Sequence, residues 1–158
     1  MRVLFVCVHN SGRSQMAEAY LRRYCGRDVV VDSAGLDPTT INPLVVTVMA
    51  EEGFDLTGKT TRKVFDFYRE GRLYDAVITV CAESLEAQCP VFPGVTHRLH
   101  LPFPDPARVS GTESERLAQV RVIRDRIRER MAALAEEIAT GWKPRLGEDR
   151  APDGKADA

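Results

Sequence analysis

Seven residues near the N-terminus, Cys7 to Arg13, have the types and spacing needed to bind and attack a small oxyanion. A loop at this place can point its backbone N–H groups inward, and an arginine adds a planar bidentate donor. The same positive field lowers the pKa of a thiol, so we expect Cys7 to be a thiolate nucleophile. The alternative is a buried, unreactive cysteine at the end of a strand. The residues expected to hold the anion are Val8, His9, Asn10, Ser11, Gly12 and Arg13.

Three further residues extend this chemistry. Asp105 lies between two prolines and is the candidate general acid for a leaving group, although an aspartate that only shapes a turn is the alternative. Cys81 ends an apolar run just as Cys7 does, and the ends of parallel strands share one edge, so we expect the two sulfurs to be close. Cys89 follows in a polar segment that we expect to be mobile.

The alternatives for the second and third thiols are two unreactive cysteines or a metal pair. Cys81 and Cys89, even with His97 and His100, lack the close cysteine spacing that is typical of structural zinc sites. We therefore expect no metal ligands among them. Cys25, at the end of a helix away from this edge, is expected to be inert.

The elements that must position these residues alternate between strand and helix. Apolar runs predict buried strands, whereas helical spacing of apolar residues with capping residues predicts helices. This alternation predicts an α/β fold: a small, doubly wound, four-stranded parallel sheet with helices on both faces, whose ligand site lies at the carboxyl ends of the strands. The strands are predicted at 2–7, 29–31, 75–81 and 97–101, and the helices at 14–24, between Asn42 and Gly53, and from Thr112 to Ile138.

Length and charge limit the remaining possibilities. The chain has 158 residues and a formal net charge of -1, which predicts one domain and excludes a basic nucleic-acid footprint or a membrane-binding face. We predict a catalytic domain over residues 1–142 and a disordered tail over 143–158. No run is long enough for a spanning helix or a signal peptide, so we expect a cytoplasmic protein whose four cysteines stay reduced.

One motif points to a different class of protein. Residues 53–60 fit the nucleotide-binding pattern of glycine, four residues, then Gly-Lys-Thr. That motif requires a strand leading directly into its first glycine, but here the preceding residues predict the end of a helix. A nucleotide-binding protein is therefore the weakest of the functions considered.

The loop, the Asp-Pro segment and the strand order together resemble the low-molecular-weight protein tyrosine phosphatase superfamily, over about residues 1 to 140. The resemblance implies the fold predicted above, with Cys7 as nucleophile, Arg13 as anion ligand and Asp105 as acid. Phosphatases of this family typically carry a tyrosine where this chain has Ala107. This difference weakens the case for a phosphotyrosine substrate.

Residues 6–18 and the segment from Thr79 to Pro90 resemble the arsenate reductases on this fold, which are usually coupled to thioredoxin. Reduction of arsenate requires two electrons, and two thiols can supply them by forming a disulfide. The resemblance implies that Cys7 attacks arsenate, that Cys81 is the second thiol and that Cys89 is the third. The reductant would be thioredoxin, glutaredoxin or a low-molecular-weight thiol. The alternative is a phosphatase that hydrolyses phosphate monoesters through a phosphocysteine.

Some arsenate reductases of this type bind potassium beside the loop, and Asn10, Glu18 and Ser33 match residues of that site. Where those members place an acid, this chain offers Arg62 and Lys63. A cationic side chain there would replace the ion. We therefore expect no cofactor and no required metal.

Overall fold

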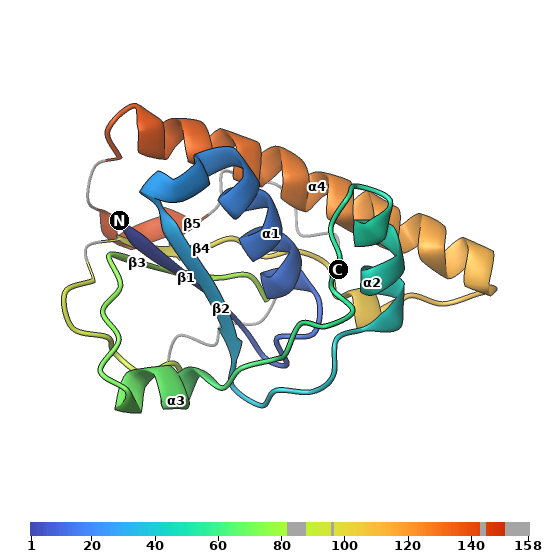
Figure 1. Ribbon diagram of the computed structural model, residues 1–158, viewed down its shortest axis with the longest axis horizontal. Coiled ribbons are helices and arrows are strands. Elements are labelled where there is room, and N and C mark those ends of the chain that lie inside the picture. Colours follow the sequence, from blue (N-terminus) through green and yellow to red (C-terminus); the bar gives the residue numbers. More distant parts are fainter. Residues whose placement is uncertain (82–87, 96, 143–144, 151–158) are drawn as a thin grey trace.

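The computed structural model describes residues 1–81, 88–95, 97–142 and 145–150, the last of these as backbone. Its centre is a parallel sheet in the order β2-β1-β3-β4-β5 (Figure 1). The four strands expected from the sequence are present, and the α/β class with helices on both faces is confirmed. They are β1 (Arg2–Cys7), β2 (Val30–Gly35), β3 (Ala76–Thr79) and β4 (His97–His100).

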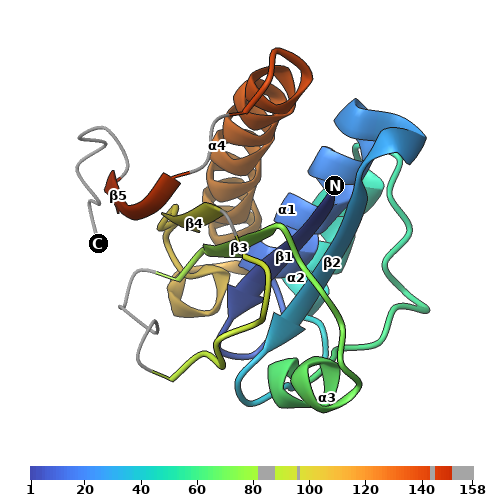
Figure 2. The same ribbon diagram turned by 90° about the vertical axis from the view of Figure 1, so that its left-hand side faces the viewer.

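Helices cover both faces of the sheet, as Figure 2 shows. Three helices share one face, and their apolar residues form the larger core with Phe5, Ile78 and Leu99 of the strands. A short helix covers the other face over a smaller core that contains Leu4 and Val6. The first group comprises α1 (Arg13–Cys25), α2 (Pro43–Ala50) and α4 (Glu113–Ala139), and the short helix is α3 (Val64–Arg69).

The predicted helix starts follow from capping. The Asn42 side chain accepts a hydrogen bond from the Leu44 amide at 2.9 Å, and Pro43 occupies the first helical position of α2. Thr112 accepts a hydrogen bond from the Glu115 amide at 3.1 Å and begins α4. These caps fix the residues at which the two helices begin.

Two elements were not predicted. The helix α3 is only six residues long, too short for its apolar spacing to stand out. The strand β5 (Arg145–Arg150) lies in the segment expected to be a disordered tail, and it pairs in parallel with β4. Five of its six residues are charged or glycine, so its sequence shows neither the apolar–polar alternation nor the apolar run that predicts a strand. Residues 151–158 of that tail lie outside the described residues.

Within the described residues, no helix combines the length and the apolar character that crossing a membrane would require.

Candidate active site

The Cys7 side chain is placed by β1, which lies between β2 and β3 in the sheet. Parallel pairing sets Cys7 beside Gly35 of β2 and Val6 beside Thr79 of β3, so the ends of the three strands form one edge. The chain then turns through residues 8–12 and enters α1 at Arg13. The turn needs a left-handed residue, and Asn10 supplies it with φ of 52°. The loop predicted from the sequence therefore lies at the carboxyl edge of the sheet.

The carbonyl groups of this loop are turned away from the anion pocket. Backbone N–H groups of the segment after β2 donate to them at 2.8 to 3.1 Å. The pairs are Leu36 to Cys7, Asp37 to Val8, Thr39 to His9 and Asn42 to Ser11. With its carbonyls occupied, the loop can offer its N–H groups to a ligand, which is the geometry of an anion-binding nest.

Gly35 allows the loop to approach the sheet this closely. A Cβ atom at Gly35 would lie 2.7 Å from the Val8 carbonyl oxygen and 2.8 Å from the Asn10 nitrogen. Both contacts are with backbone, which cannot swing away as a flexible side chain can. Sequence reasoning missed this residue, although a glycine at the end of a predicted strand is a known sign of close backbone approach.

The two strand-ending cysteines meet at this edge. The sulfurs of Cys7 and Cys81 are 2.8 Å apart and both residues are buried and free. The Cys81 thiol donates to Cys7, and this is the largest effect that lowers the pKa of Cys7 from 9.0 to about 6; burial opposes it, and the charge of Arg13 assists it. The same hydrogen bond, with burial and the Cys7 charge, raises the pKa of Cys81. The pair is therefore one thiolate with one thiol at neutral pH.

Arg13 and Asp105 form an ion pair that lines the pocket. The Arg13 guanidinium is buried, donates to the Phe103 carbonyl oxygen at 3.2 Å, and lies 3.6 Å from an Asp105 carboxylate oxygen. The other carboxylate oxygen accepts from the Ala107 amide at 2.9 Å, which caps a single 3-10 turn over Pro106–Arg108. Asp105 thus both shapes the turn and faces the anion site, so the two interpretations of this residue are compatible.

A buried chain of polar side chains supports the loop from behind. The Asn10 amide donates to Ser33 at 2.9 Å, and the Ser33 hydroxyl donates to Glu18 at 2.7 Å. The side-chain oxygen of Asn10, Oδ1, accepts hydrogen bonds from the Gln15 side chain and from the Arg62 backbone N–H, both at 3.0 Å. The four side chains of Asn10, Gln15, Glu18 and Ser33 are almost completely buried, so their mutual hydrogen bonds hold the loop in one conformation.

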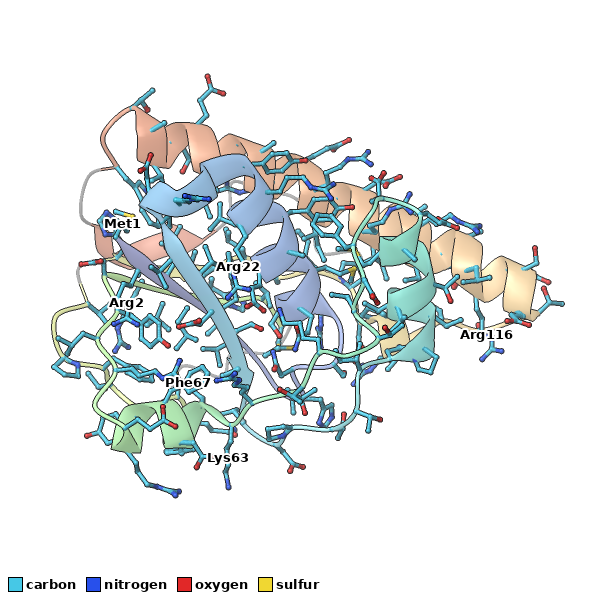
Figure 3. The ribbon with its side chains drawn as sticks, in the orientation of Figure 1. Met1, Arg2, Arg22, Lys63, Phe67 and Arg116 are labelled. Carbon is cyan, nitrogen blue, oxygen red and sulfur yellow. The ribbon has the colours of Figure 1, made fainter. Side chains whose placement is uncertain are left out.

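The cation on Glu18 is not the one predicted. The Lys59 ammonium group pairs with the Glu18 carboxylate, and Arg22 pairs with the other oxygen at 2.9 Å. Arg62 and Lys63 were the expected cations, but both side chains are exposed, and only the Arg62 backbone reaches the network. Figure 3 shows Lys63 at the outer edge of the molecule, while Phe67 of α3 points inward and Arg22 lies over β2. The cation that pairs with Glu18 therefore stands three residues before Arg62 and four before Lys63.

Lys59 belongs to the sequence that fits the nucleotide-binding pattern. Residues 53–60 follow the turn at the end of α2 and form a loop without regular structure, so no strand leads into Gly53. Its lysine is already paired with Glu18. The structural context that the motif requires is therefore absent from this part of the described chain.

Two cavities adjoin the candidate nucleophile. A small pocket lies over the loop, and a larger one of about 590 Å³ extends from Cys81 along the start of α4. His9, Arg13 and Asp105 line both. The wall of the larger cavity toward α4 is apolar, with Val109, Val122 and Ile123. The small pocket contains the reactive loop, whereas the larger cavity gives access to Cys81.

The other two cysteines lie apart from this pair. Cys89 is half-buried against the smaller core, and burial raises its pKa to about 11 although Arg98 opposes the shift. Cys25 is half-buried at the end of α1, and burial raises its pKa as well. The polar segment 86–90 around Cys89 was expected to be mobile, and its residues 86 and 87 fall in the stretch 82–87 that lies outside the described residues. Within the described residues, no group of three or more histidine, cysteine or acidic side chains is placed to hold a metal ion.

Residues 2–143 match the sequence family described as low molecular weight phosphotyrosine protein phosphatase. The chain belongs to this family. Within it, the chain is 37% identical to the arsenate reductase of Bacillus subtilis over 134 residues, which cover 85% of this chain and 94% of that protein. It is 36% identical to the arsenate reductase of Halalkalibacterium halodurans with the same coverage. The expected resemblance to arsenate reductases of the phosphatase superfamily is confirmed.

Solved structures lead to the same family. A thioredoxin-dependent arsenate reductase of Corynebacterium glutamicum has a TM-score of 0.64 and is 32% identical; the match covers 88% of this chain but 61% of that longer chain. An arsenate reductase in its phosphate binding state has a TM-score of 0.65 and is 28% identical, with 87% of this chain and 98% of that chain covered. The match to the family begins at Arg2, so it includes the whole Cys7 loop.

Proposed function

We propose that the protein reduces arsenate to arsenite with two of its own thiols. The observation that supports this most directly is the 2.8 Å separation of the Cys7 and Cys81 sulfurs inside an oxyanion-binding loop. A phosphatase needs one thiol at this place, because water can complete its reaction. A second sulfur within reach of the first provides the two electrons that arsenate reduction requires.

In the first step, the Cys7 thiolate attacks arsenic while the loop N–H groups and Arg13 hold the remaining oxygens. The hydroxyl group of hydrogen arsenate leaves as water with a proton from Asp105, its bond to arsenic breaks, and a sulfur–arsenic bond forms. In the second step, Cys81 attacks the Cys7 sulfur. The electron pair of the sulfur–arsenic bond leaves with arsenic, which becomes arsenite, and the two thiols become a disulfide.

Formation of the adduct itself activates Cys81. In the free protein the Cys7 thiolate raises the pKa of Cys81 by accepting its hydrogen bond and by its negative charge. Both influences disappear once the Cys7 sulfur is bonded to arsenic. Burial continues to raise the pKa of Cys81, whereas Arg13 and the Val8 amide, which donates to Cys81 at 3.2 Å, lower it. The second thiol therefore becomes more nucleophilic once the substrate has reacted with Cys7.

Cys89 would then attack the Cys7–Cys81 disulfide and carry it toward the surface, where thioredoxin, glutaredoxin or a low-molecular-weight thiol would reduce it. In the structure the pKa of Cys89 is raised, so this thiol must move out of its apolar contacts before it reacts. The thioredoxin-dependent structural relative supports a reductant of this type. Free thiols at rest require a reducing compartment, which favours the cytoplasm.

Lys59 would provide the positive charge behind the loop, so that no metal is needed for activity. Its ammonium group lies on the carboxylate that anchors Ser33 and, through it, Asn10. We further propose that residues 1–142 carry the catalytic functions, since every proposed reactive group lies within them.

Hydrolysis of phosphate monoesters is the second candidate. Family membership, the loop and the position of Asp105 all support it, and the first half of the two reactions is the same. A phosphocysteine cannot be reduced by Cys81 and would instead be cleaved by water. The two functions therefore differ in whether Cys81 is required.

The test measures arsenate-dependent NADPH oxidation with thioredoxin and thioredoxin reductase, beside hydrolysis of an aryl phosphate. Cys81→Ser should abolish the reductase activity and preserve hydrolysis, since serine still donates a hydrogen bond to Cys7. Cys25→Ser is the matched control and should change neither. Reduction that persists in Cys81→Ser would overturn the two-thiol mechanism, and a wild-type protein active only as a hydrolase would establish the second candidate.

A further inference from the structure

Besides Arg13, His9 is the loop residue that lines both the small anion pocket and the larger cavity. Its ring is held in a defined orientation, because Nδ1 lies 2.9 Å from the carbonyl oxygen of Asp37. A carbonyl oxygen can only accept, so Nδ1 must carry a proton. In the neutral ring, Nε2 is therefore an acceptor with a lone pair. Only the protonated ring can offer a second donor.

The charges that face His9 come from four parts of the chain, and an arriving anion would change their balance. Arg13 and Asp105 are paired at 3.6 Å, and Arg108 also approaches Asp105. The cationic and anionic side chains therefore largely offset one another in the free protein. The groups are Cys7 and Arg13 of the loop and α1, Asp37 after β2, Cys81 after β3, and Asp105 and Arg108 before α4.

A tetrahedral dianion bound in the loop adds two negative charges beside this ring. It repels a lone pair on Nε2 and attracts a donor there, so it binds the protonated ring more tightly than the neutral ring. By linkage, a ligand that prefers the protonated form must draw a proton onto the protein when it binds. Because Nδ1 is engaged by the Asp37 carbonyl oxygen, Nε2 is the ring nitrogen available to the anion.

We propose that His9 is an additional ligand of the oxyanion that binds it as an imidazolium, so that anion capture takes up a proton. This rests on the proposed oxyanion loop and adds a feature that the loop backbone cannot provide. The backbone N–H groups and Arg13 are donors at any physiological pH. His9 offers a second donor only when it is protonated, so the affinity for the dianion should fall as the pH rises from about 5 to 8.

The test uses sulfate, which stays a dianion throughout this range and cannot accept electrons from a thiol here. Sulfate binding is measured by calorimetry in Cys7→Ser, which removes the titrating nucleophile, and in Cys7→Ser/His9→Gln, in buffers of different ionisation enthalpy. We expect about 0.5 to 1 proton taken up per sulfate in the first variant and a clearly smaller uptake in the second. Affinity should fall about three- to tenfold per pH unit above neutrality only when His9 is present.

A third variant, Cys7→Ser/His9→Lys, carries a permanent charge at this place and should bind sulfate tightly with little dependence on pH. Equal proton uptake with histidine and glutamine would overturn the role of His9 while leaving the oxyanion loop intact. Failure of sulfate to bind any of the three variants would overturn both the loop and the role of His9. The comparison between histidine and glutamine cancels every titrating group that the two proteins share.

Discussion

At the scale of single residues, the proposed reactive site depends on two neighbouring sulfurs, of which one is a thiolate and the other a thiol. Cys7 and Cys81 have similar sequence surroundings, each ending an apolar run, yet the structure gives them opposite protonation states. The difference arises chiefly because Cys81 donates and Cys7 accepts the hydrogen bond between them; the charge of Arg13 and the amides of Val8 and His9 also favour the Cys7 thiolate. The proposed nucleophile and the proposed second thiol are thus distinguished by position and not by sequence.

The pH dependence of the alkylation of Cys7 by iodoacetamide measures the pKa of its thiol. In the wild type the rate should rise with a midpoint near the pKa of about 6. Cys81→Ala removes the hydrogen bond that lowers this pKa most, so the midpoint should move to higher pH. Cys81→Ser retains a donor and should shift it less. A midpoint unchanged in Cys81→Ala would show that the Cys81 hydrogen bond does not control the nucleophile.

At the scale of elements, the loop is held by the strand end on one side and by a polar network on the other. Both supports depend on residues distant in sequence, and neither touches the proposed substrate. The glycine at the end of β2 sets the distance between the loop and the sheet, and the Asn10–Ser33–Glu18–Lys59 chain sets its conformation. Each support makes a separate prediction.

Gly35→Ala should distort the loop, because the added Cβ would lie within 3 Å of three loop backbone atoms. We expect a loss of about 1–3 kcal/mol in the free energy of unfolding and much weaker sulfate binding. Gly58→Ala is a matched control, since a Cβ there meets no atom within 4 Å. Denaturant unfolding and calorimetry measure the two effects. Normal anion binding in Gly35→Ala would mean that the loop tolerates displacement.

Lys59→Met should leave the buried Glu18 carboxylate with Arg22 as its only cationic partner among the described residues. We expect about 1–3 kcal/mol of destabilisation and a higher KM for arsenate, because the network behind Asn10 is loosened. Lys63→Met, at an exposed position, is the control and should have little effect. Replacing potassium with choline should leave the wild type unchanged. A wild type that loses activity without potassium would refute the role proposed for Lys59.

At the scale of the whole molecule, the ionised Cys7 links global stability to pH. Between about pH 6 and pH 8 the folded protein carries a thiolate, while the same thiol in the unfolded chain, with a pKa near 9.0, is protonated. The unfolded state therefore binds more protons, and the free energy of unfolding should rise with pH across this window. In Cys7→Ser the free energy of unfolding should rise less steeply with pH. Parallel pH profiles of the two proteins would contradict a lowered Cys7 pKa.

Ion pairs also tie the helical layer together at this scale. Arg121 and Arg124 of α4 bind Glu51 after α2, at 2.8 Å each, and together they lower the pKa of Glu51 to about 2. Arg124 also donates to the Val48 carbonyl oxygen. Three arginines of α4 pair with the two glutamates that follow α2: Arg121, Arg124 and Arg128.

Local sequence determined the strands, the long helices and the reactive loop. Apolar runs, caps and the Cys7-to-Arg13 spacing act over a few residues, and so they can be recognised in the amino-acid sequence by itself. The helix α3 and the strand β5 were not predicted from the sequence, because a short helix and a polar edge strand depend on the neighbours that they pack against.

Tertiary structure alone decided which residues meet. Cys81 was expected near Cys7 because the ends of parallel strands share an edge. Which of the two sulfurs keeps its proton, however, depends on the sulfur–sulfur hydrogen bond seen in the structure. Lys59 pairs with Glu18, which is 41 residues away in the sequence. Gly35 lies against the loop backbone, which is 25 or more residues away in the sequence. Sequence patterns record periodicity along the chain, whereas charge pairing and close approach depend on where the folded chain brings distant residues together in space.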